Sequence, residues 1–314
     1  MFRRFFLFLA VGGLLVSRSV ALGDLPADIT AHDGLVSSLT FSPDSNQLAS
    51  AGFDGKVKIW SVADGKLIRE IAAHEKACYG VAYRPDGQAI ATAGLDGLIR
   101  IWNLADGAKL AELKGHTGIV DAVRYTPDGA MLISCGQDKT VRFWKTADNT
   151  EAKKLEGHGG TVYSITLSAD GKFAATASQD KTVRVWDIAA GAQAKELPGS
   201  EDAVLTAVFS PDGALVYSGG MDRKIRVWSV AEGKQVREIV GHTDPVFGLA
   251  LNPAGDRLVS SGYAGNINIW NAADGAKIHT VKPSFGGYSV AIAPSGKFIV
   301  TGHENGHIYV TAMP

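Results

Sequence analysis

Short apolar runs alternate with polar turn sequences along most of this chain, as residues 32–73 illustrate. The runs cover residues 36–41, 47–51, 56–60 and 66–71. In the third run, apolar and basic residues alternate with a period of two, which is the period of a strand with two unlike faces. Asp, Gly, Pro and Ser fill the connections, and these residues favour tight turns. The pattern predicts an antiparallel meander of four strands, without helical periodicity.

The same pattern recurs with a fixed period. Tryptophan closes the third run of six successive units, and neighbouring tryptophans are 42 residues apart. A four-stranded sheet alone leaves two edges and one face open, so repeated units of this length must stack. Radial stacking of such units is the architecture of a β-propeller. The six tryptophans are Trp60, Trp102, Trp144, Trp186, Trp228 and Trp270.

A seventh unit covers residues 281–311, although Thr311 stands where a tryptophan is expected. This unit ends after its third strand. Residues 24–31 can supply the fourth strand, because Ile29 falls in phase with the fourth strands of the other units. Pairing of the two ends would remove the last free edges. We therefore predict an all-β fold, a seven-bladed β-propeller of four-stranded antiparallel blades. Residues 24–314 would form it as a single domain, closed by the N-terminal strand.

Four positions recur together in the units, and their pattern resembles the WD40 repeat. They are a histidine after glycine or alanine, a hydroxyl residue in the second strand, an aspartate in the next turn, and the tryptophan. In that family these four residues form a hydrogen-bonded structural network within each blade. By resemblance, the first four networks are His32, Ser50, Asp54 and Trp60; His74, Thr92, Asp96 and Trp102; His116, Ser134, Asp138 and Trp144; and His158, Thr176, Asp180 and Trp186.

The later units depart from this pattern. Ser200 stands in place of the histidine in the fifth unit, and Ala264 stands in place of the aspartate in the sixth. The residues that remain are Ser218, Asp222 and Trp228 in the fifth unit, and His242, Ser260 and Trp270 in the sixth. We expect blades five to seven to be the less stable arc of the ring, because a buried polar network stabilises only when its members are satisfied.

The resemblance also places a partner-binding surface on the top face, formed by the loops between blades and the turns between second and third strands. Its positions are three and five residues after the histidine position, and the residue before the turn aspartate. Here they include Leu35, Phe53, Tyr79, Leu95, Ile119, Asp121, Tyr163, Leu205, Met221, Phe247, Tyr263 and Tyr288. This set is rich in Tyr, Phe and Met, which are typical of interface cores. An alternative is that some of these side chains fold inward and plug the channel.

Two patterns resemble catalytic motifs without matching their context. A Ser, a His and an Asp occur in several units, but a nucleophile site requires one oriented set and an oxyanion pocket, so the repetition indicates architecture. Residues 303–307 read His-Glu-Asn-Gly-His, which matches a zinc motif that functions on a helix. Asn-Gly at its centre predicts a tight turn instead. We expect no metal, no cofactor and no enzymatic activity.

The N-terminus differs from the repeat. Arg3 and Arg4 precede an apolar run that extends from Phe5 to Val16, and small residues follow at 19–21. This arrangement is typical of a secretory signal peptide, which would cover residues 1–23 and leave no stable membrane insertion after cleavage. The run is too short to span a bilayer core of about 30 Å comfortably. We expect export to a bacterial periplasm or to the extracellular space.

The charge of the chain gives no electrostatic reason to expect a nucleic-acid partner. The formal net charge is −1, so nothing in it favours nucleic acid. Basic residues two positions before the tryptophans are spaced around the ring, and we expect them to form ion pairs between blades. They are Lys58, Arg100, Arg142, Arg184 and Arg226.

Cys78 and Cys135 lie in strand-like segments, where a free buried thiol is the common state. A monomer is favoured.

The sequence thus predicts an exported, non-enzymatic scaffold that binds a protein or peptide through an aromatic-rich top face. The alternative is a propeller enzyme or small-ligand sensor with its site at the central channel. That alternative requires polar groups to converge there, and the candidates are Asp121, Gln137, Gln179 and Glu304. In particular, it requires Asp121 and Glu304 to share one pocket.

The signal-peptide prediction is tested by N-terminal sequencing of the mature protein from the source cells. We expect the chain to begin at Leu22 or at Asp24, because small residues precede both bonds. A mature chain that still begins at residue 1 would contradict the prediction.

Overall fold

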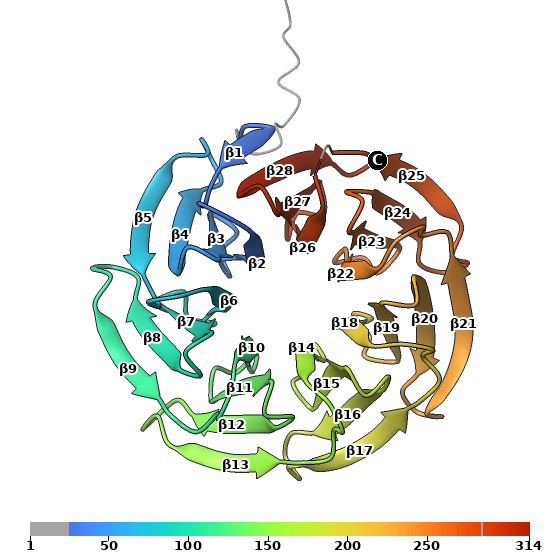
Figure 1. Cartoon of the computed structure of the whole chain (residues 1–314), viewed down its shortest axis with the longest axis horizontal. Coiled ribbons are helices and arrows are strands. Elements are labelled where there is room, and N and C mark those ends of the chain that lie inside the picture. Colours follow the sequence, from blue (N-terminus) through green and yellow to red (C-terminus); the bar gives the residue numbers. More distant parts are fainter. Residues whose placement is uncertain (1–24, 284) are drawn as a thin grey trace, which may run out of the picture.

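A computed structural model describes residues 25–283 and 285–314. Seven four-stranded antiparallel sheets surround a central axis, so the predicted all-β propeller is confirmed (Figure 1). The predicted signal peptide, residues 1–23, lies outside the described residues. Across the described ranges, the chain forms no helix that is long and apolar enough to cross a membrane.

Each blade consists of four strands in sequence order from the axis outward, except for the last. Blades one to three comprise β2 (Val36–Phe41), β3 (Gln47–Gly52), β4 (Lys56–Ser61) and β5 (Leu67–Ala72); β6 (Cys78–Tyr83), β7 (Ala89–Gly94), β8 (Ile99–Asn103) and β9 (Lys109–Leu113); and β10 (Val120–Tyr125), β11 (Met131–Gly136), β12 (Val141–Lys145) and β13 (Glu151–Leu155). Blades four and five comprise β14 (Val162–Leu167), β15 (Phe173–Ser178), β16 (Val183–Asp187) and β17 (Ala192–Leu197); and β18 (Val204–Phe209), β19 (Leu215–Gly220), β20 (Lys224–Ser229) and β21 (Lys234–Val240). Blades six and seven comprise β22 (Val246–Leu251), β23 (Arg257–Gly262), β24 (Ile267–Asn271) and β25 (Lys277–Val281); and β26 (Gly287–Ile292), β27 (Phe298–His303), β28 (His307–Ala312) and β1 (Asp28–Thr30).

The two ends of the described chain meet in blade seven. Strand β1 pairs antiparallel with β28, with Ile29 opposite Ile308, and both side chains are buried. Ile299 lies opposite Thr311, just as Leu48 lies opposite Trp60 in blade one, which places Thr311 at the tryptophan position. The N-terminal strand therefore closes the ring, as the phase of Ile29 predicted (Figure 1).

The core lies between the blades, where the facing surfaces of neighbouring sheets pack together. One cluster joins Ala91 and Ile99 of blade two to Val123 and Trp144 of blade three. The other tryptophans likewise pack against the preceding blade. Each tryptophan therefore stabilises two blades, whereas the sequence indicated a role only within its own blade.

The four-residue networks assemble in the first four blades as the resemblance implies. In blade four, Trp186 Nε1 donates to Thr176 Oγ1 at 2.8 Å, His158 Nε2 lies 2.8 Å from the same oxygen, and His158 Nδ1 lies 2.8 Å from the Asp180 carboxylate. Burial lowers the pKa of His158, which favours a neutral imidazole. The network thus joins the third strand, the second strand, the loop between blades and the turn of the aspartate.

The later blades fill their gaps with other residues. In blade five, Asp222 forms an ion pair with Arg226 in the absence of a histidine. In blade six, the buried Asp244 accepts a hydrogen bond from the Ala264 amide at 2.6 Å, which places a carboxylate beside the turn after all. In blade seven, His303 Nε2 lies 2.8 Å from Thr301 Oγ1.

The repeated basic residues form ion pairs within their own blades, so the expected pairing between blades is wrong. Arg100 contacts Asp96 at 2.7 Å and Glu112 at 3.1 Å. The reason is strand register, because Arg100 on β8 lies directly opposite Glu112 on β9. Lys58, Arg184 and Arg226 likewise lie opposite glutamates of the neighbouring fourth strand and pair with them; Arg142 pairs instead with Asp138 and Glu151 of its own blade.

Candidate functional site

A β-bulge occurs near the start of every inner strand, and it falls on the residue five positions after the histidine position. In blade three, for example, the register shifts between Val120 and Ala122, so that Asp121 has no partner on β11. A bulge redirects one side chain without ending the strand. The seven bulged residues are Ser37, Tyr79, Asp121, Tyr163, Leu205, Phe247 and Tyr288.

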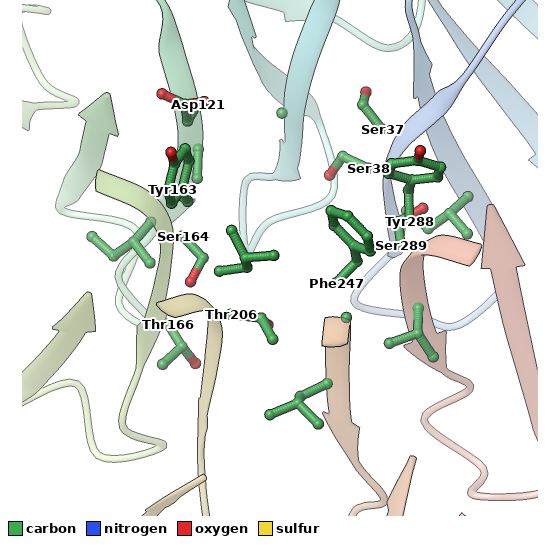
Figure 2. Close-up of a pocket in the computed structure, with 18 of the residues that line it drawn as sticks. Ser37, Ser38, Asp121, Tyr163, Ser164, Thr166, Thr206, Phe247, Tyr288 and Ser289 are labelled. Carbon is green, nitrogen blue, oxygen red and sulfur yellow. The ribbon is translucent and has the colours of Figure 1, made fainter. Parts of the chain in front are cut away.

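All seven bulged residues line a central cavity of about 640 Å³. In Figure 2, Asp121 and Tyr163 lie on one side of this cavity and Phe247 and Tyr288 lie on the other. The next residues along the inner strands are small and also line it, namely Ser38, Gly80, Ala122, Ser164, Thr206, Gly248 and Ser289. The bulged side chains therefore surround the channel but leave an open volume, so they do not plug it completely.

The remaining top-face residues lie around this ring. Leu35 and Phe53 also line the cavity, whereas Leu95, Ile119, Met221 and Tyr263 are not among its lining residues. Phe53, Met221 and Tyr263 are exposed, and Tyr263 has the largest exposed fraction of the three, 55%. The predicted surface thus divides into an inner ring around the cavity and an outer set, of which Met221 and Tyr263 are exposed while Leu95 and Ile119 are half-buried.

The aromatic residues gather in two clusters on this face. Phe53 of blade one contacts Tyr79 of blade two, with ring centroids 5.1 Å apart. Phe247 and Tyr263 of blade six meet Tyr288 of blade seven, with centroid separations from 4.7 to 6.3 Å. Both clusters bridge neighbouring blades, which holds large apolar side chains in fixed positions at the molecular surface.

Of the four polar residues that the sequence suggested for the channel, only Asp121 lines the cavity. Glu304, Gln137 and Gln179 are absent from its lining, so Asp121 and Glu304 do not share a pocket. Gln179 is instead directed to the loop backbone, where Oε1 accepts from the Thr161 amide at 3.4 Å. Within residues 25–283 and 285–314, no three His, Cys, Asp or Glu side chains are grouped to hold a metal ion.

The His-Glu-Asn-Gly-His sequence has the strand-turn-strand structure that its Asn-Gly pair predicted. His303 ends β27, His307 begins β28, and the residues between them form the turn. His303 Nδ1 lies 2.9 Å from the Phe285 carbonyl, and His307 Nδ1 lies 2.6 Å from the Asp28 carboxylate. The two imidazoles therefore form structural contacts, one with the loop at Phe285 and one with β1. Cys78 and Cys135 are free and buried.

Asp121 is the one acidic residue in the ring of bulged side chains. Its Oδ2 is buried and has no hydrogen-bond partner within the described chain. Burial raises the pKa of this carboxyl to about 7, and the nearby Asp138 carboxylate adds to the effect. Near neutral pH the group is therefore poised between its neutral and ionised forms, at the mouth of the channel.

The sequence analysis missed Arg124, which also lines the cavity. A comparison of the residue three positions after each bulge would have found it. At this position the other inner strands carry Thr40, Ala82, Thr166, Val208, Ala250 and Ala291. A single guanidinium thus interrupts a ring of small or uncharged residues.

Replacement of Asp121 by Asn tests its ionisation. Because the pKa is raised from 3.8 to about 7 on folding, ionisation of Asp121 opposes folding, and its cost grows between about pH 4 and pH 7. Asn cannot ionise. The unfolding free energy of Asp121→Asn relative to the native protein should therefore rise by as much as about 4 kcal/mol from pH 4 to pH 8 in urea titrations, at about 1.4 kcal/mol per pKa unit. A difference that is independent of pH would contradict this account.

Comparison with known protein families agrees with the repeat pattern and with the propeller fold. The family described as "WD domain, G-beta repeat" matches six segments, each ending one residue after a tryptophan: residues 23–61, 65–103, 107–145, 149–187, 191–229 and 233–271. No curated protein matches the chain. The matched segments cover well over half of the chain, and each runs from the outer strand of one blade through the first three strands of the next. This chain belongs to the WD40 family.

Proposed function

We propose that this protein is an exported, non-enzymatic scaffold that binds a protein or peptide through the aromatic residues of its top face. WD40 propellers are typically protein-interaction scaffolds and are generally not enzymes. Fold alone does not identify a function, so the proposal depends on what this chain places on its surface.

The cluster of Phe247, Tyr263 and Tyr288 is the observation that carries the proposal. Tyr263 is more than half exposed, and its ring contacts both of the others. Tyrosine and phenylalanine are enriched in interface cores, since they bury a large area at a small cost in side-chain entropy. Contact between the rings already restricts their rotamers, so a partner would bind a surface that is largely preorganised.

The open cavity beneath the ring of bulged residues also supports this proposal. A partner segment could place one side chain in the channel while its flanks contact the rings around it. The arrangement of residues 1–23 supports export, and partners are then sought in the exported fraction of the cell.

Affinity capture with the mature chain as bait tests the proposal. The double change Phe247→Ala and Tyr263→Ala removes two of the three rings from the cluster. Truncation of such interface residues costs about 2 kcal/mol or more each, which corresponds to about 30-fold weaker binding per residue. We therefore expect the captured partner to be lost.

A matched control removes exposed apolar side chains elsewhere. Ile68 on β5 and Leu110 on β9 are about as exposed as Tyr263, at 50% and 52%, but lie on outer strands. The double change Ile68→Ala and Leu110→Ala should leave capture intact. If the control variant lost the partner and the aromatic variant retained it, the top-face assignment would be wrong.

A further inference from the structure

The central channel contains a cationic group that neither the fold nor the proposed scaffold function requires. Arg124 lies on the inner strand β10 and lines the central cavity. Within the described ranges it takes part in no ion pair, although the repeated arginines of the third strands all do. Its one hydrogen bond to protein runs from Nη1 to the Val123 carbonyl, at 2.7 Å. A guanidinium carries five N–H donors, so most of its capacity is unused.

The guanidinium of Arg124 is half-buried and has no counterion in the described chain. Burial lowers the pKa of Arg124, and the only other charge effect comes from the Cys135 thiol. The group nevertheless remains charged at any physiological pH. A partly buried charge without a counterion is a ready binding site for an anion that reaches the channel. The described chain supplies no such counterion, because Asp121 lies three residues away, about 10 Å along the strand.

Hydroxyl groups accompany the guanidinium on the neighbouring strand. Thr166 on β14 occupies the position equivalent to Arg124 and lines the same cavity. Ser164, two residues earlier, also lines it, and its Oγ is buried without a hydrogen-bond partner in the described chain. Figure 2 shows Ser164 and Thr166 on the same side of the cavity as Asp121 and Tyr163. Most of the other lining residues are apolar, including Leu205, Val208 and Leu249.

We propose that the central channel is a binding site for a small organic anion, whose carboxylate or phosphate group pairs with Arg124 and whose apolar body lies among the bulged side chains. A guanidinium binds either group through two parallel N–H donors. The cavity volume of about 640 Å³ falls within the range of about 300–1,000 Å³ that is typical of small-molecule sites. Its wall combines apolar side chains with hydroxyl groups and one guanidinium, and small-molecule sites likewise combine apolar surface with fixed polar groups.

This site adjoins the proposed top-face surface, because Phe247 and Tyr288 also line the cavity, but its anionic contact is on other strands. A protein partner bound at Phe247 and Tyr263 contacts the rim, whereas the anion is held by β10 and β14 inside the channel. Loss of one kind of binding therefore does not imply loss of the other. An occupied channel would still present a different surface to a partner at its mouth.

Ligand-observed NMR titrations of the full chain test the proposal with three probes. These are 4-phenylbutyrate and phenyl phosphate, which differ in the anionic group, and the neutral 4-phenylbutyramide. We expect at least one anion to bind once per chain, and the amide to bind at least about tenfold more weakly than that anion. The anion that binds more tightly identifies the preferred group.

Two variants locate the site. Arg124→Met keeps the length of the side chain without its charge, and it should weaken anion binding about tenfold or more. Arg84→Met is the matched control, because Arg84 is bound to Asp86 outside the channel cavity, and it should leave anion binding unchanged. Failure of both anions to bind, or equal binding to the native protein and to Arg124→Met, would overturn the proposal.

Stability separates a ligand-binding role from a structural one. Without an added anion, Arg124→Met should be at least as resistant to urea as the native protein, because it removes an unpaired charge. A large loss of stability would show that Arg124 holds the fold, and would overturn the proposal. So would a result in which Arg124→Met abolishes capture of a protein partner while neither anion binds, since the anionic group would then belong to that partner.

Discussion

The hydrogen-bonded chain from tryptophan to hydroxyl, histidine and aspartate is the interaction on which the rest of this molecule depends. In blade four it runs from Trp186 through Thr176 and His158 to Asp180. Its outer end is a large side chain packed between two blades, and its inner end joins the two loops that form the top face. The residues of the candidate site lie a few positions along the chain from this same histidine or directly before this same aspartate. The network therefore positions the surface as well as stabilising the blade.

Packing between blades and closure of the ring hold the seven blades together, whereas each network acts within one blade. Each sheet buries its faces against its neighbours, and β1 covers the last edge by pairing with β28. This arrangement leaves one inner strand per blade around the channel, and each begins with a bulge. Within so regular a frame, a single replaced side chain changes the channel locally and leaves the fold unaltered. Tyr263, Asp121 and Arg124 can vary in this way because no network includes them.

Much of the fold could be predicted from the sequence, because turn residues, alternation and the tryptophan period all agree. The strand at residues 36–41 was predicted with its observed bounds, and the phase of Ile29 predicted closure. Contacts that depend on register could not be predicted. Arg100 pairs with Glu112 across one sheet because of strand alignment, and Asp244 replaces the aspartate absent at Ala264 from a different loop. The bulges could not be predicted from the sequence either, so only the structure shows that the top face divides into a ring and an outer set. Arg124 was detectable in the repeat, but only by comparison of positions inside the channel.

The central claim is that each network acts as one unit, and a double-mutant cycle in blade four tests it most directly. Thr176→Val removes the shared hydroxyl, and Trp186→Phe removes the donor that contacts it. Unfolding free energies from urea titrations of the native protein, both single variants and the double variant give the coupling energy. The account predicts a coupling of about 1 kcal/mol or more, because either single change already breaks the chain. Additive effects, within about 0.3–0.5 kcal/mol, would contradict it.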